Sequence, residues 1–90
     1  PKNLSMALAG EVAEILEIFQ WKTQQESSEL SEQEVEHLKD EIGDVLIYLL
    51  NISSKFEIDV VEAAKSKLQK NILKYPIEKS KGNSKKYTEL

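Results

Sequence analysis

The sequence predicts an all-α protein, and three observations indicate this fold class. Apolar residues recur at steps of three and four along most of the chain, which is the spacing of one helix face. Only three glycines and two prolines interrupt the 90 residues, and capping signals precede two of the apolar stretches. A chain this short buries only about 60–65% of its unfolded surface, so we expect an oligomer to supply further core.

The first helix is expected to run from about Leu4 to Lys22, and the polar stretch from Thr23 to Leu30 is expected to form a loop. The apolar face of this helix consists of Leu4, Leu8, Val12, Ile15 and Phe19. Ser31 and Glu34 then have the spacing of a capping box, which predicts a second helix that continues to about Lys55.

The second helix is apolar on more than one side. Its main stripe consists of Leu38, Ile42, Val45, Leu49, Ile52 and Phe56. Ile47 and Leu50 widen this stripe beyond what one neighbouring helix covers. A helix with this pattern is usually central in a bundle or lies in an oligomer interface.

The third helix is expected from the Asp59 cap to about Tyr75, because Pro76 disfavours a helical residue before it. The chain then changes character. Four lysines and two glutamates give residues 77–90 a net charge of +2, against −6 on residues 1–76. We expect residues 1–76 to form one domain and residues 77–90 to form a basic tail, either flexible or folded over an anionic ligand.

Composition excludes several classes of function. Twelve lysines, no arginine and 16 acidic residues give a net charge of −4, which argues against binding to polymeric nucleic acid. The absence of cysteine excludes thiolate metal ligands and cysteine nucleophiles, and a single histidine excludes a multi-histidine site within one protomer. No apolar run approaches the ~20 residues of a membrane span, and no signal peptide is visible. We expect a cytoplasmic protein with no membrane partner.

Two pairs of acidic residues mark the candidate site. Glu11 and Glu14 lie three residues apart on the first helix, and Glu41 and Asp44 have the same spacing on the second. At about 100° per residue, both pairs lie within or beside the apolar stripe of their helix. Carboxylates that converge at a helix interface repel one another unless a cation joins them. Carboxylate oxygens of this kind suit Mg²⁺ or Mn²⁺.

These two pairs, separated by 26 residues, resemble the metal signature of the all-α nucleoside triphosphate pyrophosphohydrolases, the MazG-like superfamily. Five flanking segments resemble its dCTP pyrophosphatase branch: LAGEVAE (8–14), FQWK (19–22), DVLIYL (44–49), NILKYP (71–76) and KKYTEL (85–90). The resemblance covers nearly the whole chain. The family has a further N-terminal helix with aromatic and histidine contacts to substrate, and we expect such a segment to precede Pro1 in the natural protein.

The resemblance implies an all-α bundle, assembled as a dimer or tetramer of identical chains. It implies hydrolysis of a (deoxy)nucleoside triphosphate, dCTP or a related one, to the monophosphate and pyrophosphate, as a house-cleaning activity. By similarity, Glu11, Glu14, Glu41 and Asp44 bind Mg²⁺, for which Mn²⁺ is a possible substitute. Glu14 is our candidate for the general base that takes a proton from the attacking water.

Two aromatic residues are candidates for substrate binding. Trp21 lies about 20° round the first helix from Glu14, where an indole could stack on a base. Tyr48 lies about 20° from Glu41 and resembles a substrate-contacting tyrosine of the branch. Packing in the core is the alternative for both residues.

Polar residues of the third helix are candidates for binding the triphosphate. Lys67, Asn71 and Lys74 fall within about 60° of one another, and their side chains can donate to phosphate oxygens. Solvated lysines are the alternative. Three residues of the tail are weaker candidates for the same role: Lys81, Lys85 and Tyr87.

Two other classes compete with this interpretation. Glu34 and His37 have the local spacing of a carboxylate-bridged di-iron site, but such a protomer needs two pairs and the chain has one histidine. We expect His37, close to a helix cap, to be solvated. A non-enzymatic helical scaffold explains the wide apolar surface of the second helix but not the acids beside it.

Overall fold

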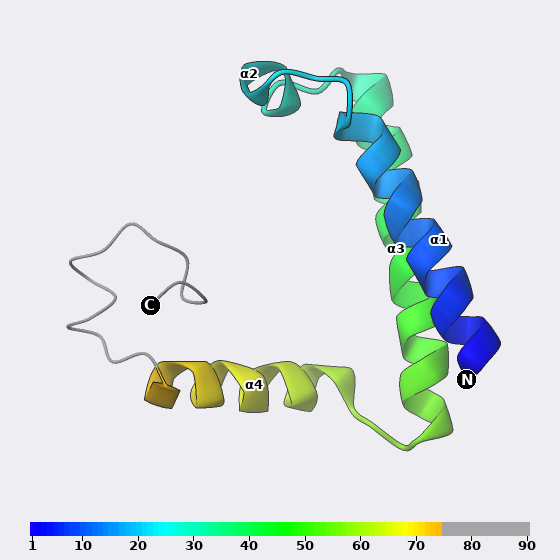
Figure 1. Cartoon of the computed structure of the whole chain (residues 1–90), viewed down its shortest axis with the longest axis vertical. Coiled ribbons are helices and arrows are strands. Elements are labelled where there is room, and N and C mark those ends of the chain that lie inside the picture. The colour runs from blue at the N-terminus through cyan, green and yellow to red at the C-terminus, as the bar shows by residue number, and fades with distance from the viewer. Residues whose placement is uncertain (75–90) are drawn as a thin grey trace. The chain divides into compact units, whose positions relative to one another are not determined.

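The protein folds into helices joined by short connections. The structure, a computed structural model, describes residues 1–74, and within this range it contains four helices and no strand. These helices are α1 (Lys2–Phe19), α2 (Gln24–Ser27), α3 (Glu32–Lys55) and α4 (Val60–Lys74) (Figure 1). The predicted all-α class is confirmed. The expected boundary at residue 76 and the tail candidates Lys81, Lys85 and Tyr87 lie outside the described residues.

The chain divides into two units, Pro1–Glu57 and a second unit that begins at Ile58. The first unit is built on α1 and α3, which lie side by side and run in opposite directions (Figure 1). The half-buried apolar side chains of both helices recur at steps of three and four, the spacing of a seam between two helices. They include Leu4, Leu8, Ile15 and Ile18 of α1, and Leu38, Val45 and Ile52 of α3.

The connection between these helices differs from the expected loop. Helix α1 ends at Phe19, three residues before the predicted end, and the Lys22 N–H donates to the Phe19 carbonyl at 2.9 Å in a tighter turn. The next segment holds the short helix α2, so the prediction of a loop there was wrong. Thr23 and Glu26 form a capping box, in which the Glu26 N–H donates to Thr23 Oγ1 at 3.1 Å and the Thr23 N–H donates to Glu26 Oε1 at 2.8 Å. The T-x-x-E signal was present in the sequence.

The predicted caps of α3 and α4 are confirmed. Ser31 and Glu34 form the expected capping box, and Lys22 makes an ion pair with Glu34 that ties the connection to the start of α3. At the start of α4, Asp59 Oδ1 accepts hydrogen bonds from the N–H groups of Val61 and Glu62, both at 3.0 Å. Both caps satisfy backbone donors that a helix leaves without partners at its first turn.

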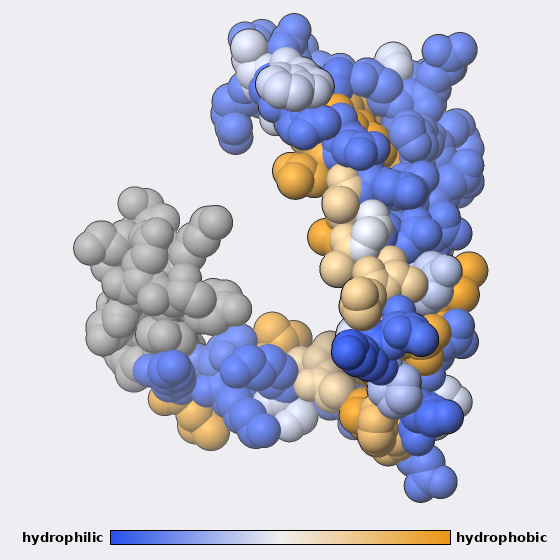
Figure 2. Space-filling view, turned by 45° about the vertical axis from the view of Figure 1, so that its right-hand side comes forward, coloured by the Kyte–Doolittle hydropathy of each residue, from blue (hydrophilic) through white to orange (hydrophobic). Residues whose placement is uncertain are grey.

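The hairpin of α1 and α3 presents an open apolar face (Figure 2). Within residues 1–74 no apolar side chain is fully buried. Exposed side chains on these helices include Val12, Leu16, Ile42, Leu46 and Leu49. On each helix these residues lie about 80–140° round from the seam in the same rotational sense, and in an antiparallel pair that sense leads to one common face. Within the described residues, the hairpin therefore leaves several apolar side chains exposed on one face.

Candidate metal centre

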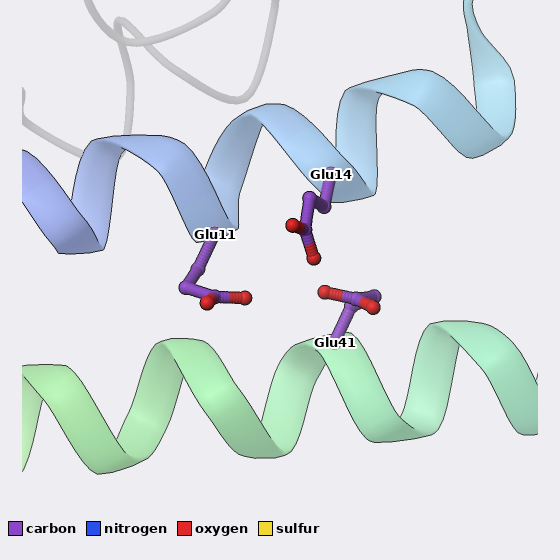
Figure 3. Close-up of side chains that lie close together, drawn as sticks. All are labelled: Glu11, Glu14 and Glu41. Atoms are coloured by element: carbon purple, nitrogen blue, oxygen red, sulfur yellow. The ribbon is translucent and has the colours of Figure 1, made fainter.

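Three carboxylates meet between α1 and α3. Glu11 and Glu14 extend from α1 toward Glu41 of α3, and one oxygen from each of the three lies within 4.8 Å of the others (Figure 3). Glu11 and Glu41 occupy positions of the helix seam whose neighbours are apolar, such as Leu8 and Leu38. Acids in such positions lose hydration on folding, so the arrangement is unfavourable without a positive partner.

Burial of this group is uneven, and part of it lacks hydrogen bonds. Glu41 is only 8% exposed, Glu11 is half-buried and Glu14 is exposed. The Oε2 atoms of Glu11 and Glu41 are buried and have no hydrogen-bond partner among residues 1–74. Buried carboxylate oxygens almost always have a donor or a cation as a partner. The two orphaned atoms therefore fit the ligands of a hard divalent cation.

The raised pKa values of two of these carboxyl groups also indicate that a positive charge would stabilise the group. The pKa of Glu41 is raised to about 7 because its hydrogen bond to Glu14 favours the protonated form, and because burial and the nearby carboxylates disfavour its charge. Burial raises the pKa of Glu11 as well, followed by the charges of Glu14 and Asp44. A proton thus partly neutralises the group at neutral pH, and a divalent cation can take its place.

The fourth predicted ligand, Asp44, lies at the edge of the group. It is exposed and is not among the three residues whose oxygens converge, but its charge raises the pKa values of both Glu11 and Glu41. Glu14 and Asp44 each lie about 60° round their helices from the seam, in the sense opposite to the apolar face. The hairpin therefore carries acids on one face and exposed apolar side chains on the other.

His37 joins this acidic face, which the sequence interpretation missed. Its Nε2 atom lies 3.4 Å from Glu41 Oε1, and its side chain is 60% exposed. The signal was the four-residue spacing from His37 to Glu41, which places both on one side of a helix. Glu34, which has the spacing of a di-iron partner of His37, instead caps α3 and pairs with Lys22.

The two aromatic candidates stand in different surroundings. Trp21 is 88% exposed, so it does not fill the core of this chain. It follows the end of α1 by two residues, and the helical spacing used to place it beside Glu14 therefore does not apply. Tyr48 is half-buried on α3, two turns beyond Glu41.

The three polar candidates of the third predicted helix all lie on α4, in the second unit. Lys67 and Lys74 are exposed and Asn71 is half-buried. They retain the helical spacing that places them on one side of α4. Within residues 1–74, no helix is both long enough and apolar enough to cross a membrane.

Comparison with known proteins gives a consistent result. A model of the MazG-like family matches residues 7–90. The chain is 41% identical over 92 aligned residues to dCTP pyrophosphatase 1 of Rattus norvegicus and 42% identical to that of Homo sapiens, and these alignments cover all of this chain. The chain spans 54% of the length of these relatives.

A solved structure also resembles the fold. A pyrophosphatase from Archaeoglobus fulgidus is 48% identical in sequence and superposes with a TM-score of 0.78. The superposition covers 84% of this chain and 71% of the archaeal one.

Proposed function

Because this chain belongs to the MazG-like family, we propose that it carries the metal-binding core of a nucleoside triphosphate pyrophosphohydrolase. The reaction converts a (deoxy)nucleoside triphosphate to the monophosphate and pyrophosphate, as cytoplasmic house-cleaning of the nucleotide pool. The observation that carries this proposal is the group of Glu11, Glu14 and Glu41, with its two orphaned buried oxygens. The names of the rat and human relatives favour dCTP or a related deoxynucleotide as the substrate.

The carboxylates would hold Mg²⁺, or Mn²⁺ in its place. The group of three supplies oxygen ligands only, which is the preference of both ions, and Asp44 would complete the set from its edge. When bound, the ion neutralises triphosphate charge and lowers the pKa of a coordinated water. Seam packing of α1 against α3 holds Glu11 and Glu41 in place before the ion arrives.

Glu14 is our proposed general base. It is the exposed member of the group, so water and substrate can reach its carboxylate. Its place beside Glu11 and Glu41 puts it where a water bound to the same group would release a proton. Both neighbours are less accessible, which favours them as ligands.

Candidate substrate contacts are found in the first unit and, separately, on α4. The open indole of Trp21 can stack on a base, and the hydroxyl of half-buried Tyr48 can donate a hydrogen bond. On α4, Lys67, Asn71 and Lys74 offer cationic and amide donors for triphosphate oxygens. Stacking alone accepts any base, so specificity requires hydrogen bonds to the base edges.

A homo-oligomer, a dimer or a tetramer, would cover the apolar face. The face formed by residues such as Val12, Leu16, Ile42 and Leu46 is exposed in this chain, which favours its use as an interface between copies. A second copy offers a surface of the same chemistry, and helix pairs of two chains can pack as a four-helix bundle. Leu46→Glu is expected to shift the mass measured by light scattering toward the monomer, because it places a charge in the proposed interface.

The same apolar face favours a second candidate function, a helical scaffold without activity. The two functions are separated by measuring pyrophosphate release from each of the four dNTPs, with and without Mg²⁺, on the full-length protein. We expect metal-dependent release that is fastest with dCTP. Release from another nucleotide would reject only the dCTP preference. No release from standard or unusual nucleotides, and no thermal stabilisation by Mg²⁺ with nucleotide, would favour the scaffold.

A further inference from the structure

His37 is a nitrogen-bearing side chain that the structure places beside the acidic group. It precedes Glu41 by one turn of α3, and its Nε2 atom lies 3.4 Å from Glu41 Oε1. His37 and Asp44 lie on the same side of Glu41, about 40° and 60° round the helix. His37 therefore borders the face that carries the acids, and not the apolar face of the hairpin.

The 3.4 Å between these two atoms is long for a strong hydrogen bond, and it is short enough for both atoms to reach one ion. Hydrogen bonds from a ring nitrogen to a carboxylate are usually about 2.7–2.9 Å long. Two ligands that each lie about 2.1 Å from one ion are about 3.0 Å apart at a right angle and about 3.4 Å apart at the tetrahedral angle. The observed 3.4 Å lies at the upper end of this range.

The second oxygen of Glu41 provides an independent observation. The side chain of Glu41 is only 11% exposed, and its Oε2 atom has no hydrogen-bond partner among residues 1–74. One oxygen of this carboxylate thus lies beside an imidazole while the other is orphaned. A carboxylate in these surroundings can contribute to a cation on the His37 side and to one held by the group of three.

We propose that His37 Nε2 is a ligand of a divalent cation held together with Glu41. This proposal deepens the proposed function and rests on it. Imidazole is a good ligand for first-row transition ions, whereas Mg²⁺ binds oxygen ligands almost exclusively. A site with one nitrogen ligand therefore favours Mn²⁺ and Co²⁺ over Mg²⁺ more than an all-carboxylate site does. The side chain of His37 is exposed enough to turn toward such an ion.

The test uses Mn²⁺ bound to the full-length protein and detects nitrogen directly. Electron spin-echo envelope modulation of the Mn²⁺-loaded protein is expected to show coupling to a ¹⁴N nucleus. Incorporation of ¹⁵N-histidine is expected to change that coupling, which would identify the nitrogen as one of histidine, and the His37→Gln variant then assigns it to His37. His37→Gln is expected to remove the coupling and to weaken Mn²⁺ binding by about tenfold or more, with Mg²⁺ binding nearly unchanged.

Glu36→Gln is the matched control, because it changes the exposed neighbour of His37 on the same helix. It is expected to keep the nitrogen coupling and the Mn²⁺ affinity. Mn²⁺ bound to the wild-type protein without nitrogen coupling would overturn the role of His37 and leave the carboxylate site standing. Absence of Mn²⁺ binding, or equal binding by Glu41→Gln, would overturn the metal centre itself and His37 with it.

Discussion

Glu34 and Glu41 lie seven residues apart on α3, two helical turns along nearly the same side, yet their chemistry is opposite. The carboxylate of Glu34 receives the Lys22 ammonium and the Ser31 N–H, which lower its pKa to about 2. The pKa of Glu41 is raised to about 7, since its neighbours are a hydrogen-bonded carboxyl and further acids. Both residues are glutamates, so the difference between their pKa values comes from the groups that the fold places near each carboxylate.

This difference separates a structural acid from a candidate functional one. Glu34 has its donors within the chain, and its negative charge stabilises the start of α3, where the helix dipole also favours an anion. Glu41 has no donor for its Oε2 atom in the described residues and carries a charge that the surroundings resist. A carboxylate held in unfavourable surroundings is typical of a site that binds a ligand.

Glu41→Gln tests whether Glu41 is a functional acid, and of the substitutions considered it has the largest expected effect on activity. The amide cannot replace a carboxylate ligand, so we expect pyrophosphate release to fall by more than about 100-fold. In the absence of metal at pH 8, the same variant is expected to melt at a higher temperature than the wild type. The reason is that it removes a charge that the neighbouring acids oppose.

Asp40→Asn is the matched control, because it changes the preceding exposed carboxylate of the same helix. Its pyrophosphate release is expected to stay within about twofold of the wild type, as for most exposed substitutions away from a site. Full activity of Glu41→Gln would remove this residue from the metal centre. A lower melting temperature for Glu41→Gln without metal would mean that the acids stabilise one another.

Trp21→Ala tests the region beside the Glu34 cap, because Trp21 precedes Lys22, the ion-pair partner of Glu34. Loss of a stacking side chain is expected to raise KM for the nucleotide by about 5- to 100-fold, because a base–aromatic stack contributes about 1–3 kcal/mol. Mg²⁺ affinity and melting temperature should change little, since the indole is 88% exposed. Trp21→Phe, which keeps an aromatic face, should retain most of the affinity. A fall in melting temperature with unchanged KM would identify Trp21 as a packing residue of the assembled protein.

The fold was predictable where local chemistry decides it. Caps at Ser31 and Asp59 and the apolar spacing correctly gave the starts of α3 and α4, because these signals act within a few residues. The end of α1 was not predicted, since no glycine or proline marks it and the Lys22–Glu34 pair that holds the turn joins residues 12 apart. The short helix α2 was missed although Thr23 and Glu26 signalled it.

The site was predictable in part, for a physical reason. Helical spacing placed Glu11, Glu14 and Glu41 beside the seam, and pairing of α1 with α3 then brings them together. Their depth and orphaned oxygens depend on packing between the helices, which spacing alone does not determine. His37 is 60% exposed, which agrees with the solvated side chain that its position near a cap predicted, but its contact with Glu41 was not predicted.

Glu34→Ala tests whether Glu34 is a structural acid, and it is expected to lower stability without changing metal binding. It removes the ion pair with Lys22 and one half of the capping box, so the melting temperature should fall by about 3–8 °C. Glu34→Gln keeps the cap acceptor and should lose less. Glu32→Gln, an exposed neighbour in the same first turn, is the control. Mg²⁺ affinity should not change in any of these variants. A loss of affinity in Glu34→Ala would show that the cap at Glu34 and the metal centre at Glu41 are not independent.

Glu41 and Glu34 should give the pH dependence of stability two slopes of opposite sign. Between pH 4.5 and about 7 the folded protein keeps a proton on Glu41 that the unfolded chain has released, so metal-free stability falls as pH rises through this range. Below pH 4.5 Glu34 takes up a proton in the unfolded chain, whereas in the folded protein it stays ionised down to about pH 2. Stability therefore falls as pH decreases through this range. In EDTA, the melting temperature should therefore have its maximum near pH 4.5–5.

Substitutions and metal should separate these two slopes. Glu41→Gln is expected to flatten the slope above pH 5, and Glu34→Gln the slope below pH 4.5. Saturating Mg²⁺ should reverse the slope above pH 5, because the cation binds the deprotonated carboxylate and competes with its proton. A melting temperature in EDTA that rises steadily from pH 5 to pH 8 would mean that Glu41 ionises freely in the folded protein. In that case Glu41 would resemble Glu34, and the strongest physical reason for a cation at the centre of the hairpin would be lost.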